Sequence, residues 1–312
     1  MAEPEAKHVA EPQGETRCGF IAVIGAPNAG KSTLVNALVG AKVTIVSRKV
    51  QTTRIPVRGI VVEGQSQLVF LDTPGIFKPR RRLDRAMVEA AWRGALDADI
   101  VILLVDAAKG IDEDVERILE RLKETDRPKI LALNKVDRLK QKEKLLILAD
   151  ELTKRVPFER VFMISALTES GLHDLRSYLV EAVPVGPWHF PPDEISDLSE
   201  RILAAEITRE KIYDRLHEEL PYAITVETTG WKNRRDGSVR IEQDIFVERE
   251  SQRKIVLGKN GAAIKQISME ARKELAKLFG HEVHLFLYVK VRENWADDPE
   301  RYREMGLDFP KE

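Results

Sequence analysis

Short, uninterrupted apolar runs alternate with amphipathic stretches over the first 180 residues. The strand-like segments that contain these runs are residues 20–24, 68–71, 100–105, 129–133 and 160–164, the last two beginning with Lys129 and Arg160. Between them, apolar residues recur at helical spacing, most clearly at Val115, Ile118, Leu119 and Leu122. Continuous apolar runs are typical of strands buried on both faces, and their alternation with helices indicates a parallel sheet. The pattern predicts a doubly wound α/β domain over residues 17–183.

The pattern changes in the last third of the chain. Residues 184–192 hold four prolines and residues 193–200 are acidic and polar, so 184–200 is predicted to be a linker. After it we expect a helix, two strands (224–228 and 239–247), a helix, a Gly-rich turn, a long helix and a strand (282–291). This order predicts an α+β domain over 201–292, followed by a short helix and tail over 293–312. The polar, Pro- and Glu-rich residues 1–16 are expected to form a disordered extension.

A phosphate-loop motif follows the first apolar run. Residues 25–32 fit the pattern G-x-x-x-x-G-K-S between a predicted strand and a predicted helix. Backbone N–H groups of such a loop, together with the helix dipole, bind phosphate oxygens. Lys31 is expected to reach the β- and γ-phosphates, and Ser32 to bind Mg²⁺. The predicted phosphate contacts are Gly25, Ala26, Pro27, Asn28, Ala29, Gly30, Lys31, Ser32 and Thr33.

A second motif, Asp72-Thr73-Pro74-Gly75, follows the second apolar run. Asp72 is expected at a strand end facing the phosphate loop, where it would hold magnesium through water. Gly75 would donate its backbone N–H to the γ-phosphate, and Ile76 follows it in the predicted nucleotide site. By itself this tetrapeptide is also typical of an ordinary turn.

Two further motifs select the base. Asn134-Lys135-Val136-Asp137 ends the fourth apolar run and Ser165-Ala166-Leu167 ends the fifth. The Asp137 carboxylate can accept hydrogen bonds from N1–H and the amine of guanine, whereas adenine lacks both donors on that edge. Sites of this kind discriminate by about 10⁴ to 10⁵. The domain is therefore expected to use GTP and GDP, with Mg²⁺.

Composition and charge restrict the classes of protein to which the chain can belong. The chain has 312 residues, a net charge of −1 and a single cysteine, Cys18, so it cannot form an internal disulfide. We expect a cytoplasmic protein, because it shows neither a signal peptide nor an 18-residue apolar stretch. The near-zero net charge gives no global sign of nucleic-acid binding. Any such surface must be local.

A local basic segment surrounds the Gly-rich turn. Residues 251–277 carry seven lysines and arginines against two glutamates. A G-x-x-G loop between two helices can approach a sugar-phosphate chain, and the order of elements is that of a type II KH domain. The alternative is a basic patch that serves only protein contacts. The predicted RNA contacts are Arg253, Lys254, Gly258, Lys259, Asn260, Gly261, Ile264 and Lys265.

Over residues 17–309 the chain resembles the Era family of bacterial GTPases. The resemblance rests on the motifs above, on Ser-Arg-Lys-Val-Gln-Thr-Thr-Arg at 47–54, and on Glu-Ile-Thr-Arg-Glu-Lys at 206–211. It implies a Ras-like P-loop GTPase domain joined to a KH domain that binds the 3′ end of 16S rRNA and assists 30S subunit maturation. It also implies peripheral association with the inner membrane; we expect a monomer that does not bind DNA. The linker sequence differs from the usual family sequence at residues 189–192 and 198–199.

The resemblance also suggests roles in hydrolysis. Residues 47–56 would be the first switch, with Thr53, or else Thr52, coordinating magnesium. Catalysis is assigned to Lys31, Thr53, Asp72 and Gly75. Ile76 stands where Ras-type proteins carry the water-orienting glutamine, so turnover is expected to be slow. As a hypothesis, Asn28 helps hold a K⁺ ion that substitutes for an arginine finger.

Three alternatives remain at this stage. A P-loop metabolic kinase would not need the guanine-reading Asn134 and Asp137. A tRNA-modifying GTPase would need a further domain that we do not find. An RNA-binding module with an inactive nucleotide domain is disfavoured by Lys31, Ser32 and Asp72.

Overall fold

The computed structural model describes residues 14–47, 49, 52–216, 224–293 and 295–310. The chain divides into two compact units. The first contains the chain up to Val43, Pro56–Lys78 and Val88–Asp197, and the second contains Thr44–Ile55, Pro79–Met87 and the chain from Leu198 onward. Most of the predicted N-terminal extension lies outside the described residues.

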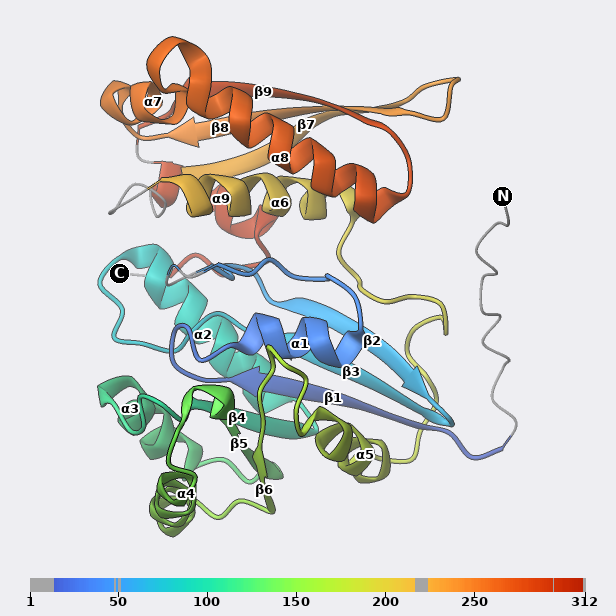
Figure 1. Cartoon of the computed structure of the whole chain (residues 1–312), viewed down its shortest axis with the longest axis vertical. Helices are drawn as coiled ribbons and strands as arrows, with labels where there is room; N and C mark the ends of the chain where they lie inside the picture. The colour runs from blue at the N-terminus through green and yellow to red at the C-terminus, as the bar shows by residue number, and fades with distance from the viewer. Residues whose placement is uncertain (1–13, 48, 50–51, 217–223, 294, 311–312) are drawn as a thin grey trace. The chain divides into compact units, whose positions relative to one another are not determined.

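The first unit is built on a six-stranded sheet (Figure 1). Its strands are β1 (Arg17–Ile24), β2 (Val57–Glu63), β3 (Ser66–Asp72), β4 (Ile100–Asp106), β5 (Lys129–Asn134) and β6 (Arg160–Met163). Their order is β2-β3-β1-β4-β5-β6, and only β2 is antiparallel to its neighbour. The five predicted strands form the parallel part, which confirms the doubly wound α/β prediction. The edge strand β2 was not predicted.

Helices cover both faces of this sheet. They are α1 (Lys31–Val39), α2 (Arg82–Asp97), α3 (Glu113–Leu122), α4 (Glu143–Arg155) and α5 (Leu172–Ala182). Apolar residues of α2, α3 and α4 share one buried cluster with the sheet, and those of α1 and α5 share another. Burying both faces explains why these strands are apolar throughout. The polar residues lie at the carboxyl ends of these strands, where a ligand site can form.

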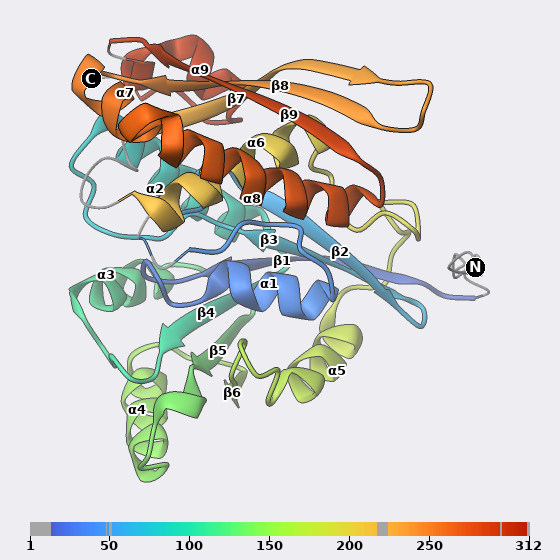
Figure 2. The same ribbon diagram turned by 45° about the horizontal axis from the view of Figure 1, so that its top comes forward.

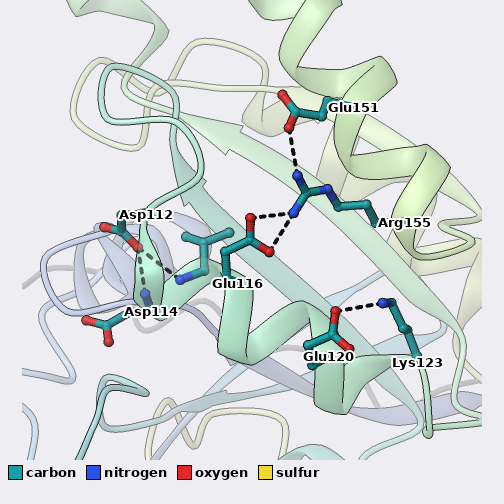
Figure 3. A network of polar contacts seen from close by, with 8 residues as sticks. Asp112, Asp114, Glu116, Glu120, Lys123, Glu151 and Arg155 are labelled. Atoms are coloured by element: carbon teal, nitrogen blue, oxygen red, sulfur yellow. Dashed lines mark hydrogen bonds and ion pairs between the residues drawn. The ribbon is translucent and has the colours of Figure 1, made fainter.

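Ion pairs connect α3 with α4 on the outside of the first unit (Figure 3). Asp112 caps α3 by accepting hydrogen bonds from the backbone N–H groups of Asp114 and Val115. Arg155 of α4 donates to both carboxylate oxygens of Glu116 at 2.5 Å and to Glu151 at 2.8 Å. Such partly exposed pairs are screened by solvent, so each contributes little to stability. They help to fix helices that flank the strands carrying the base-reading residues.

The second unit contains a three-stranded sheet of order β7-β8-β9. Its elements are α6 (Glu200–Arg215), β7 (Ile224–Asn233), β8 (Val239–Val247), α7 (Glu250–Leu257), α8 (Ala262–Phe279), β9 (Val283–Val291) and α9 (Pro299–Glu304). Short 3-10 turns occupy Lys259–Gly261 and Trp295–Asp297. Helices α6 and α8 lie side by side on the sheet (Figure 2). This is the α+β order predicted for a type II KH domain.

The predicted C-terminal helix is present as α9. Trp295, which precedes this helix, and Tyr302, which lies within it, are both buried. Among the residues that the structure describes, every helix is too short or too polar to cross a membrane.

Candidate nucleotide site and RNA-binding loop

The phosphate loop connects β1 to α1 and has the backbone shape that its sequence predicts. Gly30 has φ 104° and Asn28 has φ 61°, a left-handed conformation that is uncommon for a residue with a side chain. A Cβ on Gly30 would clash with Nδ2 of Asn134. Glycine is therefore required at this position by both its φ angle and the space available.

Lys31 is buried at the first position of α1. Its Nζ donates hydrogen bonds to the backbone oxygens of Gly25 and Ala26, both at 3.1 Å. Burial lowers the pKa of Lys31 to about 8; nearby Asp72 opposes this effect and Lys135 adds to it. The charged form of Lys31 is therefore poorly compensated within the protein, and a phosphate group would stabilise it.

The lowered pKa of Lys31 predicts a pH-dependent nucleotide affinity. Phosphate binding favours the charged amine, so affinity is retained below the free-protein pKa and falls above it. Between pH 7.0 and 8.5 the Kd for GDP should rise about fourfold, which titration calorimetry can measure. A Lys31→Arg variant keeps its charge and should show no such slope, although it will bind more weakly. A flat profile for the unmodified protein would contradict the inference.

Ser32 and Asp72 lie together, as predicted for a magnesium site. The Ser32 hydroxyl donates to Oδ2 of Asp72 at 2.8 Å, and Asp72 is the last residue of β3. A hydroxyl and a carboxylate beside a phosphate loop are the hard oxygen donors that Mg²⁺ takes in such sites. Thr73 is fixed next to them by a hydrogen bond to the backbone oxygen of Val23. These residues fit magnesium.

The base-reading motifs are joined to the phosphate loop through Asn134. Its Nδ2 donates to the backbone oxygen of Ala29 at 2.8 Å, and its Oδ1 accepts from the backbone N–H of Ala166 at 2.9 Å. Ser165 donates to Oδ1 of Asp137 at 2.6 Å. Residues more than 100 positions apart in the chain thus form one polar network. The structure brings the phosphate-loop motif and both base-reading motifs into a single site.

Asp106 is a member of this network that sequence analysis missed. It ends β4 beside Asn134 of β5, and its Oδ2 accepts from Nζ of Lys135 at 2.7 Å. Lys135, which has φ 65°, also donates to the backbone oxygen of Asn28 at 2.6 Å. The sequence did contain a sign of this role, because Asp106 is an acidic residue at the end of a predicted parallel strand. Such sheets bind ligands at the edge where their strands end.

Gly75 and Ile76 follow β3. Ile76 is buried and its backbone N–H donates to the oxygen of Gly25 at 3.1 Å. A Cβ on Gly75 would lie 3.0 Å from Pro27. The second motif therefore lies against the phosphate loop.

Thr53 belongs to the second unit, in which Thr44–Ile55 cluster with the chain from Leu198 onward. Ile45 enters a buried cluster with Ala204 and Ile207. The backbone N–H of Val46 donates to Oε1 of Glu210 at 2.8 Å. Thr53 is itself buried, so its role as a magnesium ligand stays a prediction. Residues 48, 50 and 51 of the predicted first switch lie outside the described residues.

Two buried arginines hold the segment that contains Thr53. Arg54 donates to the backbone oxygen of Ile224 at 2.8 Å and to the hydroxyl of Tyr213 at 3.0 Å. Arg209 of α6 donates to the backbone oxygen of Thr52 at 2.6 Å. Buried guanidinium groups are costly unless they are well paired. Both arginines lie in segments that carry the family resemblance, but the sequence assigned neither of them a role, since their partners are distant in the chain.

The G-x-x-G loop lies between α7 and α8. Gly258, Asn260 and Gly261 have φ angles of 71°, 52° and 75°. A Cβ on Gly258 would lie 2.7 Å from Cβ of Ala263, whereas Gly261 faces open space. The loop therefore exposes backbone where a nucleic-acid chain could approach it closely.

The other predicted RNA contacts surround this loop in different environments. Lys254, Lys259 and Lys265 are exposed. Ile264 is half-buried and packs against the core of the second unit. Arg253 is paired with Glu250 at 3.1 Å on the same helix. The three lysines are thus the most accessible of the predicted cations beside the loop.

A sheet carrying a phosphate loop and a guanine-reading network, followed by a KH-type unit, defines a P-loop GTPase with an RNA-binding module. Family models for a 50S ribosome-binding GTPase and for a KH domain match residues 20–135 and 219–296. GTPase Era of Rhizobium meliloti (strain 1021) is 66% identical over 296 residues, covering 95% of this chain and 94% of the relative. GTPase Era of Bradyrhizobium sp. (strain ORS 278) is 64% identical, with 96% and 97% coverage.

Solved structures of Era proteins also match this chain. A crystal structure of Era with MgGDPNP and nucleotides 1506–1542 of 16S ribosomal RNA matches with a TM-score of 0.89 and 38% identity, covering 93% of this chain and 99% of that one. A variant of Aquifex aeolicus Era bound to GDP.AlF4⁻ matches with the same values. The chain belongs to the GTPase Era family and is a GTP-hydrolysing enzyme, which removes the kinase and inactive-domain alternatives.

Proposed function

We propose that this protein binds the 3′ end of 16S rRNA through its KH unit, under the control of GTP, and assists 30S subunit maturation. The observation that carries the proposal is the left-handed G-x-x-G loop with its exposed lysines, on the same chain as a complete guanine site. The relative crystallised with MgGDPNP and 16S rRNA supports the choice of RNA. We propose further that the protein acts in the cytoplasm, with peripheral membrane association, and that it is a monomer. The predicted domain bounds are also part of the proposal.

In the nucleotide site, we assign phosphate binding to the loop N–H groups and Lys31, and magnesium to Ser32, Asp72 and Thr53. Bound magnesium would neutralise charge that develops on the phosphate oxygens. Asp137 binds guanine, and Asn134 fixes the base-reading motifs against the phosphate loop. Gly75 senses the γ-phosphate with its backbone N–H. These residues position the nucleotide, which is the larger part of catalysis in phosphoryl transfer.

Potassium stimulation is a further part of the proposal. Ile76 cannot orient a water molecule, whereas Asn28 presents its side chain from a left-handed position in the phosphate loop. A K⁺ ion held there would stabilise charge between the phosphates, as an arginine finger does. We expect GTP hydrolysis at least tenfold faster in K⁺ than in Na⁺ at equal ionic strength, an effect of at least about 1.4 kcal/mol on the barrier. Equal rates in the two salts would contradict this role.

The residues around Thr53 support coupling between nucleotide binding and RNA binding. The same segment that is expected to order around γ-phosphate is held on α6 by Arg54 and Arg209. If GTP orders this segment around magnesium, its contacts with α6 and β7 would change, and the KH unit would change with them. By linkage, RNA must then alter GTP affinity by the same factor that GTP alters RNA affinity.

The test is to measure RNA affinity with GDP and with a nonhydrolysable GTP analogue bound. We expect a ratio of about 5 to 150, the usual range of allosteric coupling. Tyr213→Phe removes the hydroxyl that accepts from Arg54 and keeps the ring, so it should change this ratio while leaving GTP hydrolysis in the absence of RNA intact. Identical affinities in the two nucleotide states would mean that the units are tethered and not coupled. No RNA binding in either state would overturn the proposed function.

A further inference from the structure

A second basic run, residues 78–85, lies apart from the sequence motifs used above. Its sequence, Lys-Pro-Arg-Arg-Arg-Leu-Asp-Arg, has five cations and one carboxylate in a chain whose net charge is −1. Arg80, Arg81 and Arg85 are exposed. The run follows the Asp72–Gly75 motif, whose Gly75 is expected to donate its backbone N–H to the γ-phosphate, and it leads into α2.

The one acidic residue of the run is used to shape its backbone. Asp84 is buried, and its Oδ2 accepts hydrogen bonds from the backbone N–H groups of Arg80 and Arg81 at 3.1 and 3.0 Å. Pro79 restricts the turn before them. Asp84 therefore fixes the turn that presents the two arginines.

The helix dipole does not favour this placement of cations. The run lies at the N-terminus of α2, where the helix dipole favours negative side chains and disfavours positive ones. Asp84 is the only acidic residue in the first turn. Sequences break such local rules mainly at functional sites. A dense group of arginines in an unfavourable position points to an anionic partner.

From Pro79 onward, the run belongs to the same compact unit as the KH fold. Residues Pro79–Met87 cluster with the chain from Leu198 onward. Arg82 lies 3.5 Å from Asp297 and over the ring of Phe309, 4.9 Å from its centroid. Leu83 is buried. These contacts anchor the run to the C-terminal segment, so Arg80, Arg81 and Arg85 are carried by the RNA-binding unit.

We propose that Arg80, Arg81 and Arg85 form a second RNA surface that binds phosphodiester groups of the RNA held by the G-x-x-G loop. This inference rests on the proposed function and extends it. Arginine forks match phosphate geometry, and the contacts would be independent of sequence. Residues 77–88 are all described, and none of their large apolar side chains is exposed, which favours an RNA backbone over a lipid surface.

The experiment uses the full chain and an RNA of nucleotides 1506–1542 of 16S rRNA, the fragment bound by the relative. Binding of the unmodified protein, of Arg80→Glu/Arg81→Glu and of Arg80→Gln/Arg81→Gln is measured over a range of salt concentrations. The matched control is Lys140→Glu/Lys142→Glu, which makes the same charge change in the segment before α4. Thermal unfolding checks that each variant folds.

We expect the glutamate variant to bind at least tenfold more weakly than the control near 0.1 M salt. The slope of log affinity against log salt should fall by about 1.4 for two lost phosphate contacts with single-stranded RNA, in both Arg variants. Arg variants that match the unmodified protein would overturn the second surface and leave the proposed function standing. If the unmodified protein does not bind this RNA, both fail. Loss of binding to anionic vesicles with RNA affinity unchanged would assign the run to a membrane and overturn the proposal.

Discussion

Asp137→Asn is expected to lower GTP affinity by about 10³-fold or more and to create affinity for XTP. The Asp137 carboxylate would accept hydrogen bonds from N1–H and the amine of guanine, and an amide cannot accept both. Burying these donors without acceptors is costly. Xanthine carries a carbonyl in place of the amine, so the amide N–H of asparagine can donate to it. Fluorescent-nucleotide competition measures both affinities.

The structure offers a suitable control for this substitution. Ser165 donates to Oδ1 of Asp137, and an asparagine oxygen can accept the same bond, so the fold of the site is expected to persist. Asp150→Asn, on the exposed face of α4, makes the same charge change away from the site. It should bind GTP normally. An Asp137→Asn protein that keeps its GTP affinity would show that this residue does not read the base.

Gly258→Asp is expected to weaken RNA binding by about 100-fold or more. Position 258 has φ 71°, which strains a residue with a side chain, and its Cβ would lie 2.7 Å from Cβ of Ala263. The loop must shift, and the new carboxylate would repel phosphate. Because GTP binds elsewhere in the chain, GTP hydrolysis without RNA should be unchanged. Binding to the 16S rRNA 3′ end and GTPase assays measure the two effects.

Gly280→Asp is the matched control. Gly280 has the same φ of 71°, but it caps the far end of α8, and nothing lies within 4 Å of a Cβ built there. It therefore adds the same charge at a glycine of positive φ without altering the G-x-x-G loop, although ψ is 10° at Gly280 and 175° at Gly258. Equal loss of RNA binding in both variants would attribute the effect to general destabilisation of the KH unit. Full binding by Gly258→Asp would remove the loop from the RNA site.

The chemistry of the nucleotide site could be predicted because it depends on contiguous residues. A phosphate loop needs glycine, lysine and serine at fixed spacing, since consecutive backbone N–H groups must converge on one anion. Base reading needs Asn134 and Asp137 within one short turn. The apolar runs that precede these motifs identify buried parallel strands, and parallel strands bring their carboxyl ends to one edge. The motifs in the sequence and the positions of the strands before them therefore predict the same site.

The edge strand β2 shows where local pattern was insufficient. Arg58 and Gly59 separate the apolar Val57 from the apolar residues 60–62, and Glu63 ends the strand. Along the strand, residues range from buried to exposed. Neither strict alternation nor a continuous apolar run marks it. Pairing with β3 decides that this segment is a strand.

Taken by itself, the sequence determined the class of each domain, the parallel strands of the first, the order of elements in the second and the motifs of the GTP site. Only the tertiary structure decided that Asp106 fixes Lys135, that Asn134 joins three motifs, and that Arg54 and Arg209 hold the segment around Thr53. The physical reason is that these contacts join residues from 29 to 170 positions apart. A hydrogen bond between distant residues leaves no periodicity or spacing in the sequence, because the fold alone brings the donor to its acceptor.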